Sequence, residues 1–155
     1  MKPEIGIPHD TRIEIANKLA HFLADSHSLY FTTHSYHWNV TGPHFHALHE
    51  LFGTQYTELW NALDEIAERI RSLGELAPLN LDALTGLATL PQAEGVPDAE
   101  GMIRHLLTGH EHVAKTGRVI IGLAADVHDD ATADLTTQRV QIHEKTAWML
   151  RSMLG

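Results

Sequence analysis

The sequence contains no cysteine. Disulfide bonds, iron–sulfur ligation and thiolate zinc sites are therefore excluded, because each of them needs a cysteine sulfur. The same absence leaves the cellular compartment undecided.

Long uncharged apolar runs are also missing, so no transmembrane helix and no membrane partner are expected. The first ten residues, MKPEIGIPHD, contain no apolar signal segment, and we therefore expect a cytoplasmic protein. Alternation of apolar and polar residues, which is typical of β-strands, is absent as well. The lack of this strand pattern favours an all-α protein.

Positive charge is scarce. Lysine and arginine together number 11 against 20 aspartate and glutamate residues, which gives a net charge of −9 with histidine neutral. An acidic surface does not favour contact with the phosphate backbone of nucleic acid or with an anionic membrane. It does favour the uptake of cations.

Apolar residues make up 43% of the 155 residues, which is enough to build a core. At this length we expect a single domain over residues 1–155, with residues 1–10 as a short irregular arm that holds two prolines. Apolar residues recur at helical spacing in four stretches. The first predicted helix covers 11–39, with Thr11 as N-cap and Glu14 reaching back to it in a capping box.

Three further helices follow. The second predicted helix begins near His44 and ends before Gly74, a residue type that is common at helix C-termini. The third begins after Asp98 as N-cap, and the fourth follows the break DVHDDATAD and runs to the C-terminus. Residues 75–97 form a long connection, and we expect a short helix over 81–87 within it. Connections that are short, long and short are typical of a ferritin-like four-helix bundle with one long crossover.

Histidine is the outlying residue type, with 13 copies in the chain. His37, His44, His46 and His49 fall within thirteen positions. Imidazoles and carboxylates at this density suggest a site for zinc, iron or copper. Four-helix carboxylate proteins usually hold iron inside the bundle through Glu-x-x-His motifs, and this sequence has none. The apolar seams of the second and fourth predicted helices also run without interruption, so a di-iron centre inside the bundle is not expected.

The polar side of the second predicted helix offers another arrangement. Asp64 and Glu68 lie one helical turn apart on one face and could hold a cation together. His49 lies roughly 22 Å away along the same helix, so one chain cannot join these groups. If the helix packs antiparallel against its copy in a two-fold mate, His49 of one chain faces Asp64 and Glu68 of the other, and this contact occurs twice. His37, just before the turn, reaches the same place.

The alternative interpretation is solvated surface charge, and it would be preferred for Asp64 and Glu68 taken alone. For His44 and His46 we favour the interpretation that they are polar residues of the first helical turn and do not bind metal. The combination of His37, His49, Asp64 and Glu68 favours metal binding.

The segments YHWNVTGPHFHALHELF and LDEIAERI closely resemble those of the mini-ferritins called Dps proteins, DNA-binding proteins from starved cells. The resemblance extends over nearly the whole chain. It implies a shell of twelve subunits that oxidises ferrous iron at two-fold interfaces, preferably with hydrogen peroxide. The shell stores ferric mineral and so protects against oxidative stress. It also implies that His37 and His49 are ligands from one subunit, that Asp64 and Glu68 come from the second, and that Trp38 lies beside the site.

One departure from the family pattern concerns the metal ligands. The family usually has an acidic ligand four residues after the second histidine, and Gly53 occupies that position here. This puts in doubt the number of irons held and the rate of oxidation. His143 is the first candidate for a compensating ligand, and His34 is the second. A site with more histidine and fewer carboxylates would shift preference toward zinc.

Two hypotheses follow for the function. The first is a ferroxidase that stores iron and whose turnover Gly53 is expected to impair. The second is a shell protein that binds zinc or a single iron and has slow or no ferroxidase turnover. Hydrogen peroxide is the expected oxidant in the first, and zinc is the alternative metal at the same site.

The other departures concern DNA and the pores. Many Dps proteins bind DNA through a lysine-rich tail, whereas the arm here has only Lys2 against Glu4 and Asp10, so we expect weak or absent DNA binding. Asp130 and Asp134 match acidic positions that line the family's three-fold pores, where acid rings attract Fe²⁺. The alternative is that these acids only complement the positive end of a helix.

Overall fold

A computed structural model describes residues 3–155. Its helices are α1 (His9–Asn39), α2 (Phe45–Ser72), α3 (Leu81–Thr85), α4 (Ala99–Asp126) and α5 (Asp130–Ser152). No strand occurs within the described residues. None of these helices combines the length and the apolar character that a membrane span needs. The expected all-α architecture is confirmed.

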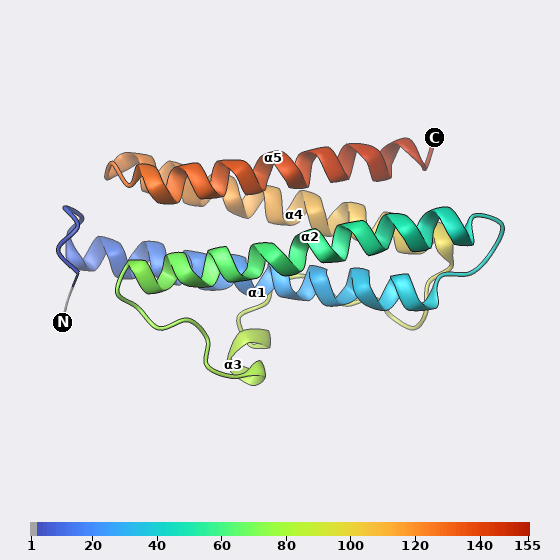
Figure 1. Ribbon diagram of the computed structural model, residues 1–155, viewed down its shortest axis with the longest axis horizontal. Helices are drawn as coiled ribbons and strands as arrows, with labels where there is room; N and C mark the ends of the chain where they lie inside the picture. The colour runs from blue at the N-terminus through green and yellow to red at the C-terminus, as the bar shows by residue number, and fades with distance from the viewer. Residues whose placement is uncertain (1–2) are drawn as a thin grey trace.

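The four long helices form two antiparallel pairs (Figure 1). α1 packs against α2, α4 packs against α5, and α1 also packs against α4. The link between α2 and α4 crosses the bundle from one end to the other and carries the short helix α3 on the side of α1 (Figure 1). The predicted order of short, long and short connections is therefore correct, and Asp98 caps α4 through Gly101 N–H at 2.8 Å as expected.

The start of the first helix differs from the prediction. α1 begins at His9, with Pro8 before it, and no side chain caps it. Thr11 lies inside the helix, so the predicted capping box is wrong. Proline is favourable here because its fixed φ suits a helix start and it has no N–H to be satisfied. Met1 and Lys2, which belong to the expected arm, lie outside the described residues.

The core is a column of apolar side chains between the two pairs. Its fully buried members include Ile15, Leu19, Phe22, Phe52, Leu59, Ile66, Leu106, Ile120 and Leu150. They recur at the three- and four-residue spacing that the sequence showed. Burial of this apolar face holds the long helices together, because helix propensity alone contributes little.

Polar side chains interrupt this core on α2, α4 and α5. His110 on α4 and His143 on α5 are buried, and their Nδ1 atoms lie 2.9 Å apart. Arg139, one turn before His143, is also buried and pairs with Glu58 on α2. The expectation of uninterrupted apolar seams is therefore wrong for the second and fourth predicted helices, since Gln55 on α2 is buried too.

Burial makes both histidines hard to protonate. Burial first, and then the positive charge of Arg139, lower the pKa of His110 to about 3. Burial, followed by the neighbouring His110 and Arg139, lowers the pKa of His143 well below 6.5. Both imidazoles are thus neutral inside the folded bundle at neutral pH.

The crossover is attached to the bundle by one buried carboxylate. Asp25 on α1 accepts the backbone N–H groups of Thr89 at 2.5 Å and Leu90 at 3.1 Å. It also accepts the Thr89 hydroxyl at 2.7 Å and lies 3.2 Å from His112 Nε2 on α4. This single side chain joins α1, the crossover and α4.

A second polar contact joins the ends of α2 and α5. Asp129 caps α5 by accepting from Thr132 N–H at 3.0 Å. Arg69 on α2 donates to Asp129 at 2.7 Å and to the Thr132 hydroxyl at 2.8 Å. The first turn of α5 is therefore fixed against α2.

The buried histidine pair predicts sensitivity to acid. Unfolded, these imidazoles bind protons below about pH 6.5, whereas in the folded chain they stay neutral at lower pH, to about 3 for His110. The free energy of unfolding therefore carries no penalty from these two histidines above pH 6.5. It falls as pH drops, by about 1.4 kcal/mol per pH unit for each histidine.

Urea unfolding at pH 7 and pH 5 measures this loss. The double variant His110→Leu with His143→Leu should lose less stability between the two pH values than the parent chain. His46→Gln, which changes an exposed histidine, is the control and should keep the parental loss. Equal losses in all three proteins would show that the pair does not cause the acid sensitivity.

Candidate metal centre

His37 and His49 form a pair that is joined by reciprocal hydrogen bonds, where α1 ends and α2 begins. Their rings are stacked, with centroids 3.7 Å apart and an angle of 20° between the planes. His37 Nδ1 lies 2.7 Å from the carbonyl oxygen of His49, and His49 Nδ1 lies 2.8 Å from the carbonyl oxygen of His37. The turn at Gly42, where φ is +110°, brings the two helix ends together.

This geometry decides which nitrogen of each ring carries the proton. A backbone carbonyl oxygen can only accept a hydrogen bond, so each Nδ1 has to be the donor. In the neutral ring Nε2 then has a free lone pair, which is the form in which histidine binds metals. A hydrogen bond from the other ring nitrogen is also the usual way in which a metal-binding histidine is oriented.

Gly53 lies directly against the His37 ring. A Cβ atom at this position would be 3.2 Å from Cε1 and 3.3 Å from Nδ1 of His37. Such contacts are tight, so a side chain at position 53 would press on the ring. Position 53 therefore offers no side-chain ligand, and the His37 ring lies directly against it.

The two candidates for a compensating ligand differ sharply. His143 is 0% exposed inside the bundle and pairs with His110 between α5 and α4, so the proposal that it completes the site is wrong. His34 lies beside His37, with ring centroids 6.2 Å apart, and burial and then the charge of His37 lower its pKa. His34 thus stays a candidate.

Aromatic rings surround the histidines. His34 stacks on Tyr56 with centroids 3.8 Å apart, and its Nδ1 lies 3.2 Å from the Tyr30 hydroxyl. Trp38 is the aromatic residue expected beside the site. Its ring centroid lies 4.1 Å from that of His34, and its side chain is 58% exposed. Tyr30 and Tyr56 were not among the predicted site residues. Their positions four residues before His34 and seven after His49 were a usable signal, since such spacings lie on one helix face.

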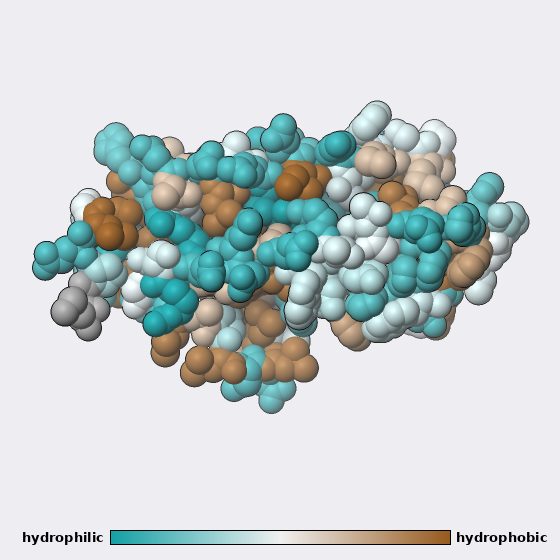
Figure 2. Space-filling view, viewed as in Figure 1, coloured by the Kyte–Doolittle hydropathy of each residue, from teal (hydrophilic) through white to brown (hydrophobic). Residues whose placement is uncertain are grey.

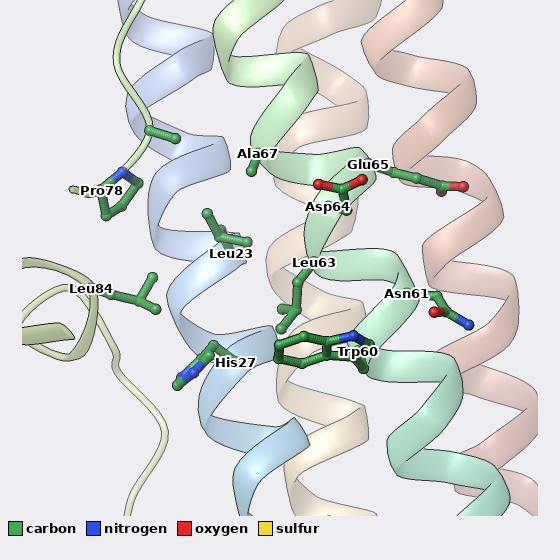
Figure 3. A pocket seen from close by; sticks show the side chains of 11 residues that line it. Leu23, His27, Trp60, Asn61, Leu63, Asp64, Glu65, Ala67, Pro78 and Leu84 are labelled. Carbon is green, nitrogen blue, oxygen red and sulfur yellow. The ribbon is translucent and has the colours of Figure 1, made fainter. Parts of the chain in front are cut away.

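Asp64 and Glu68 lie farther along α2 and are exposed. Asp64 lines a cavity of about 570 Å³ between α1, α2 and the crossover, together with His27, Trp60 and Pro78 (Figure 3). Neither carboxylate has a salt bridge to any residue in the range 3–155. Both are therefore free to bind a cation or a partner.

One chain does not bring the predicted ligands together. No group of three His, Asp or Glu side chains that could hold a metal ion occurs among residues 3–155. The structure joins His37 with His49, and it keeps Asp64 and Glu68 separate from them on the same helix. That the two half-sites meet across a two-fold interface stays a prediction.

The predicted pore acids are exposed at the start of α5. Asp130 lies in the first turn, and Asp134, one turn later, accepts a hydrogen bond from Gln138 at 2.7 Å. Asp129, which was not among the predicted residues, pairs with Arg69 and holds this turn in place. The D-x-x-T spacing of Asp129 and Thr132 is a capping signal that could have identified it.

Both the sequence and this architecture are similar to those of known proteins. The model of the ferritin-like domain family matches residues 16–155. DNA protection during starvation protein 2 of Bacillus anthracis is 34% identical over 143 residues, which cover 92% of this chain and 96% of that protein. The chain belongs to the Dps family. Its predicted resemblance to the mini-ferritins is confirmed.

Solved Dps structures match the fold over almost its whole length. The Dps protein of Vibrio cholerae O1 has a TM-score of 0.94 and 29% identity, and the match covers 99% of this chain and 97% of that one. That protein is described as a member of a broad superfamily of ferritin-like diiron-carboxylate proteins. Dps from Thermosynechococcus elongatus has a TM-score of 0.91 and 29% identity, covering 94% and 93% of the two chains. The ferritin-like fold is confirmed.

The contact between Gly53 and His37 predicts the effect of a methyl group. Gly53→Ala should displace the His37 ring and weaken Zn²⁺ binding several-fold by calorimetry. Gly122→Ala is the matched control, because a Cβ there meets nothing within 4 Å. The control should gain up to about 1 kcal/mol of stability from helix propensity. Gly53→Ala should gain less, and unchanged Zn²⁺ affinity would contradict the packing argument.

Proposed function

We propose that this Dps chain is a ferroxidase and iron-storage protein that oxidises Fe²⁺ at sites shared between two subunits of a dodecameric shell. The observation that carries the proposal is the His37–His49 pair, in which both Nδ1 atoms face carbonyl oxygens. Two oriented imidazoles with free Nε2 lone pairs suit a transition metal. Ferrous iron is the substrate of this site.

The two carboxylates of α2 support a site that spans two chains. Asp64 and Glu68 are exposed and without salt bridges in the described part of the chain. An antiparallel contact between two copies of α2 would bring them to the histidines of the partner. Carboxylate oxygens add the negative charge that Fe²⁺ and Fe³⁺ prefer over imidazole alone.

Exposed hydrophobic side chains support assembly. Figure 2 shows hydrophobic surface gathered over the crossover around α3. The exposed side chains there include Leu79 and Leu81, and Trp60 on α2 is 57% exposed at the rim of the Asp64 cavity. Large exposed apolar side chains around a cavity are typical of an interface. The two-fold contact of the proposed shell would cover them.

The proposed reaction balances with two ferrous ions. Each Fe²⁺ gives one electron, and hydrogen peroxide takes up two electrons and two protons as its O–O bond breaks, which yields two water molecules. The protein's contribution is to hold iron next to an open position, with ligands and charge already in place. Protection against oxidative stress follows, because iron and peroxide are consumed together.

A second candidate function is a shell that binds one iron or zinc per site with slow turnover. The observation in its favour is Gly53, which offers no ligand at the position where the family usually has an acid and leaves that space to the His37 ring. Zinc accepts such a histidine-rich set readily. Fast ferric absorbance after peroxide is added to Fe²⁺-loaded protein supports iron storage. Slow oxidation that stoichiometric Zn²⁺ blocks supports the alternative.

Mixed shells test whether the site is shared. One variant carries His37→Ala with His49→Ala, and the other carries Asp64→Asn with Glu68→Gln. Each alone should lose the fast ferric absorbance phase. Shells made by coexpressing both in equal amounts should regain about a quarter of the parental sites, because half of the pairs are mixed and each mixed pair has one intact site.

The exposed histidine variant His46→Ala is the control and should keep the parental rate. If the mixed shells stay as inactive as the single variants, the site does not combine histidines and acids from two chains.

We also infer that the shell binds duplex DNA weakly or not at all, although relatives are named for DNA protection. The net charge is −9, and counterion release from phosphates needs clustered cations. A gel shift at physiological salt should leave duplex DNA free at micromolar protein. A variant with added lysines at the N-terminus should retard it, and retardation by the parent chain would refute the inference.

A further inference from the structure

Five buried polar atoms have no hydrogen-bond partner within residues 3–155, and every long helix contributes at least one of them. They are Ser26 Oγ on α1, Gln55 Oε1 on α2, His110 Nε2 on α4, and Arg139 Nε and His143 Nε2 on α5. Gln55 is the most exposed of these residues, at 8%. Buried polar atoms are nearly always hydrogen-bonded, so a set of this size indicates that something binds between them.

Ion pairs between α2 and α5 place Gln55 at the height of His143. Arg69 pairs with the residue that caps the start of α5, whereas Glu58, earlier on α2, pairs with Arg139 farther along α5. The two helices are therefore antiparallel, as Figure 1 shows. Gln55 lies three residues before Glu58. It is thus level with the turn of α5 that follows Arg139, and this turn contains His143.

Packing contacts place Ser26 at the same height on α1. Phe22, one turn before Ser26, has its ring edge-on to the ring of His143, with centroids 6.4 Å apart. Leu29, three residues after Ser26, lies against Gly109, which directly precedes the buried histidine of α4. The four long helices therefore meet in one polar layer, which consists of Ser26, Gln55, His110, Arg139 and His143.

The histidine pair determines which hydrogen bonds the layer can make. The Nδ1 atoms of His110 and His143 lie 2.9 Å apart, and this contact is a hydrogen bond only if one Nδ1 carries a proton and the other does not. Both rings are neutral at neutral pH. The ring whose Nδ1 accepts therefore carries its proton on Nε2, and the other ring has a lone pair on Nε2. The pair thus presents one donor and one acceptor to the rest of the layer.

The other three atoms complete a balanced set. Arg139 Nε–H is a donor, Gln55 Oε1 is an acceptor, and the Ser26 hydroxyl can do both. A metal ion does not suit this set, because only one imidazole lone pair is free and Arg139 is positively charged. An anion does not suit it either, because the layer also holds acceptors and Glu58 already neutralises Arg139. An uncharged molecule that both donates and accepts hydrogen bonds does suit it.

We propose that the polar layer is a binding site for water inside the bundle, where about two water molecules bridge its five atoms, since a buried water makes about three hydrogen bonds. The bridging waters join α2 to α5 and α1 to α4 at the centre of the core. They also satisfy the polar atoms that would otherwise destabilise it. No residue of the layer belongs to the proposed iron site, so this proposal does not depend on the ferroxidase function.

Neutron diffraction tests the layer directly, with crystals of the parent protein exchanged into D₂O at pH 7. We expect one deuteron between the two Nδ1 atoms, one deuteron in total on the two Nε2 atoms, and D₂O within hydrogen-bond distance of both Nε2 atoms and of Gln55 Oε1. The proposal is wrong if the layer contains no D₂O, or if two deuterons are found on the Nε2 atoms.

A pair of shape-conserving variants tests the role of the polar side chains. Gln55→Met keeps an unbranched side chain but removes Oε1. Thr33→Val is the matched control, because Thr33 is also buried but its hydroxyl already donates to the Leu29 carbonyl oxygen at 2.7 Å. In high-resolution crystal structures, Gln55→Met should lose the water bound at position 55, and Thr33→Val should keep every water of the layer. Unchanged solvent density in Gln55→Met would contradict the proposal.

Zinc tests the competing class of occupant. Crystals of the parent protein soaked in Zn²⁺ should give no anomalous peak within the polar layer at the zinc absorption edge, whatever they give at His37 and His49. A zinc peak bonded to His110 or His143 would show that the layer is a metal site, and the water proposal would then be refuted.

Discussion

The reciprocal hydrogen bonds of His37 and His49 are the contact on which the proposed site depends. They join the last turn of α1 to the second turn of α2, and they fix the tautomer of both rings in one step. The His37 ring also lies against Gly53, so that a Cβ atom at position 53 would be 3.2 Å from the Cε1 atom of His37. At position 53 the chain thus has a close contact with the His37 ring in place of a side-chain ligand.

The interior of the bundle shows a different use of histidine. His110 and His143 occupy the core, where four-helix carboxylate proteins usually hold metal, yet the charge of Arg139 disfavours a cation beside them. Their rings have one shared hydrogen bond, and both Nε2 atoms lack a partner among the described residues. Buried polar atoms of this kind cost stability when unpaired. The same side chain type is therefore a ligand candidate at the α1–α2 turn and a liability in acid at the centre.

Much of the fold was predictable from the sequence, and the reasons are local. Apolar spacing, Gly74 and the cap at Asp98 mark helices whose ends are set by nearby residues. The pairing of His110 with His143 and the contact of Gly53 with His37 were not predictable, because each joins two helices whose relative rotation no spacing reports. Periodicity assigned His143 to a helix but not to a partner, so it was mistaken for a site residue. The pairing of His37 with His49 was easier, since a short turn separates them.

The attachment of the crossover by Asp25 has a consequence for how this protein can change over evolution. Two of the four partners of the carboxylate are backbone N–H groups, at Thr89 and Leu90. Backbone groups are present whatever the side chain, so the segment before the attachment can vary in sequence and length while its end stays fixed. That segment carries α3 and lines the cavity at Asp64. The protein can therefore remodel one wall of its cavity without disturbing the bundle that carries it.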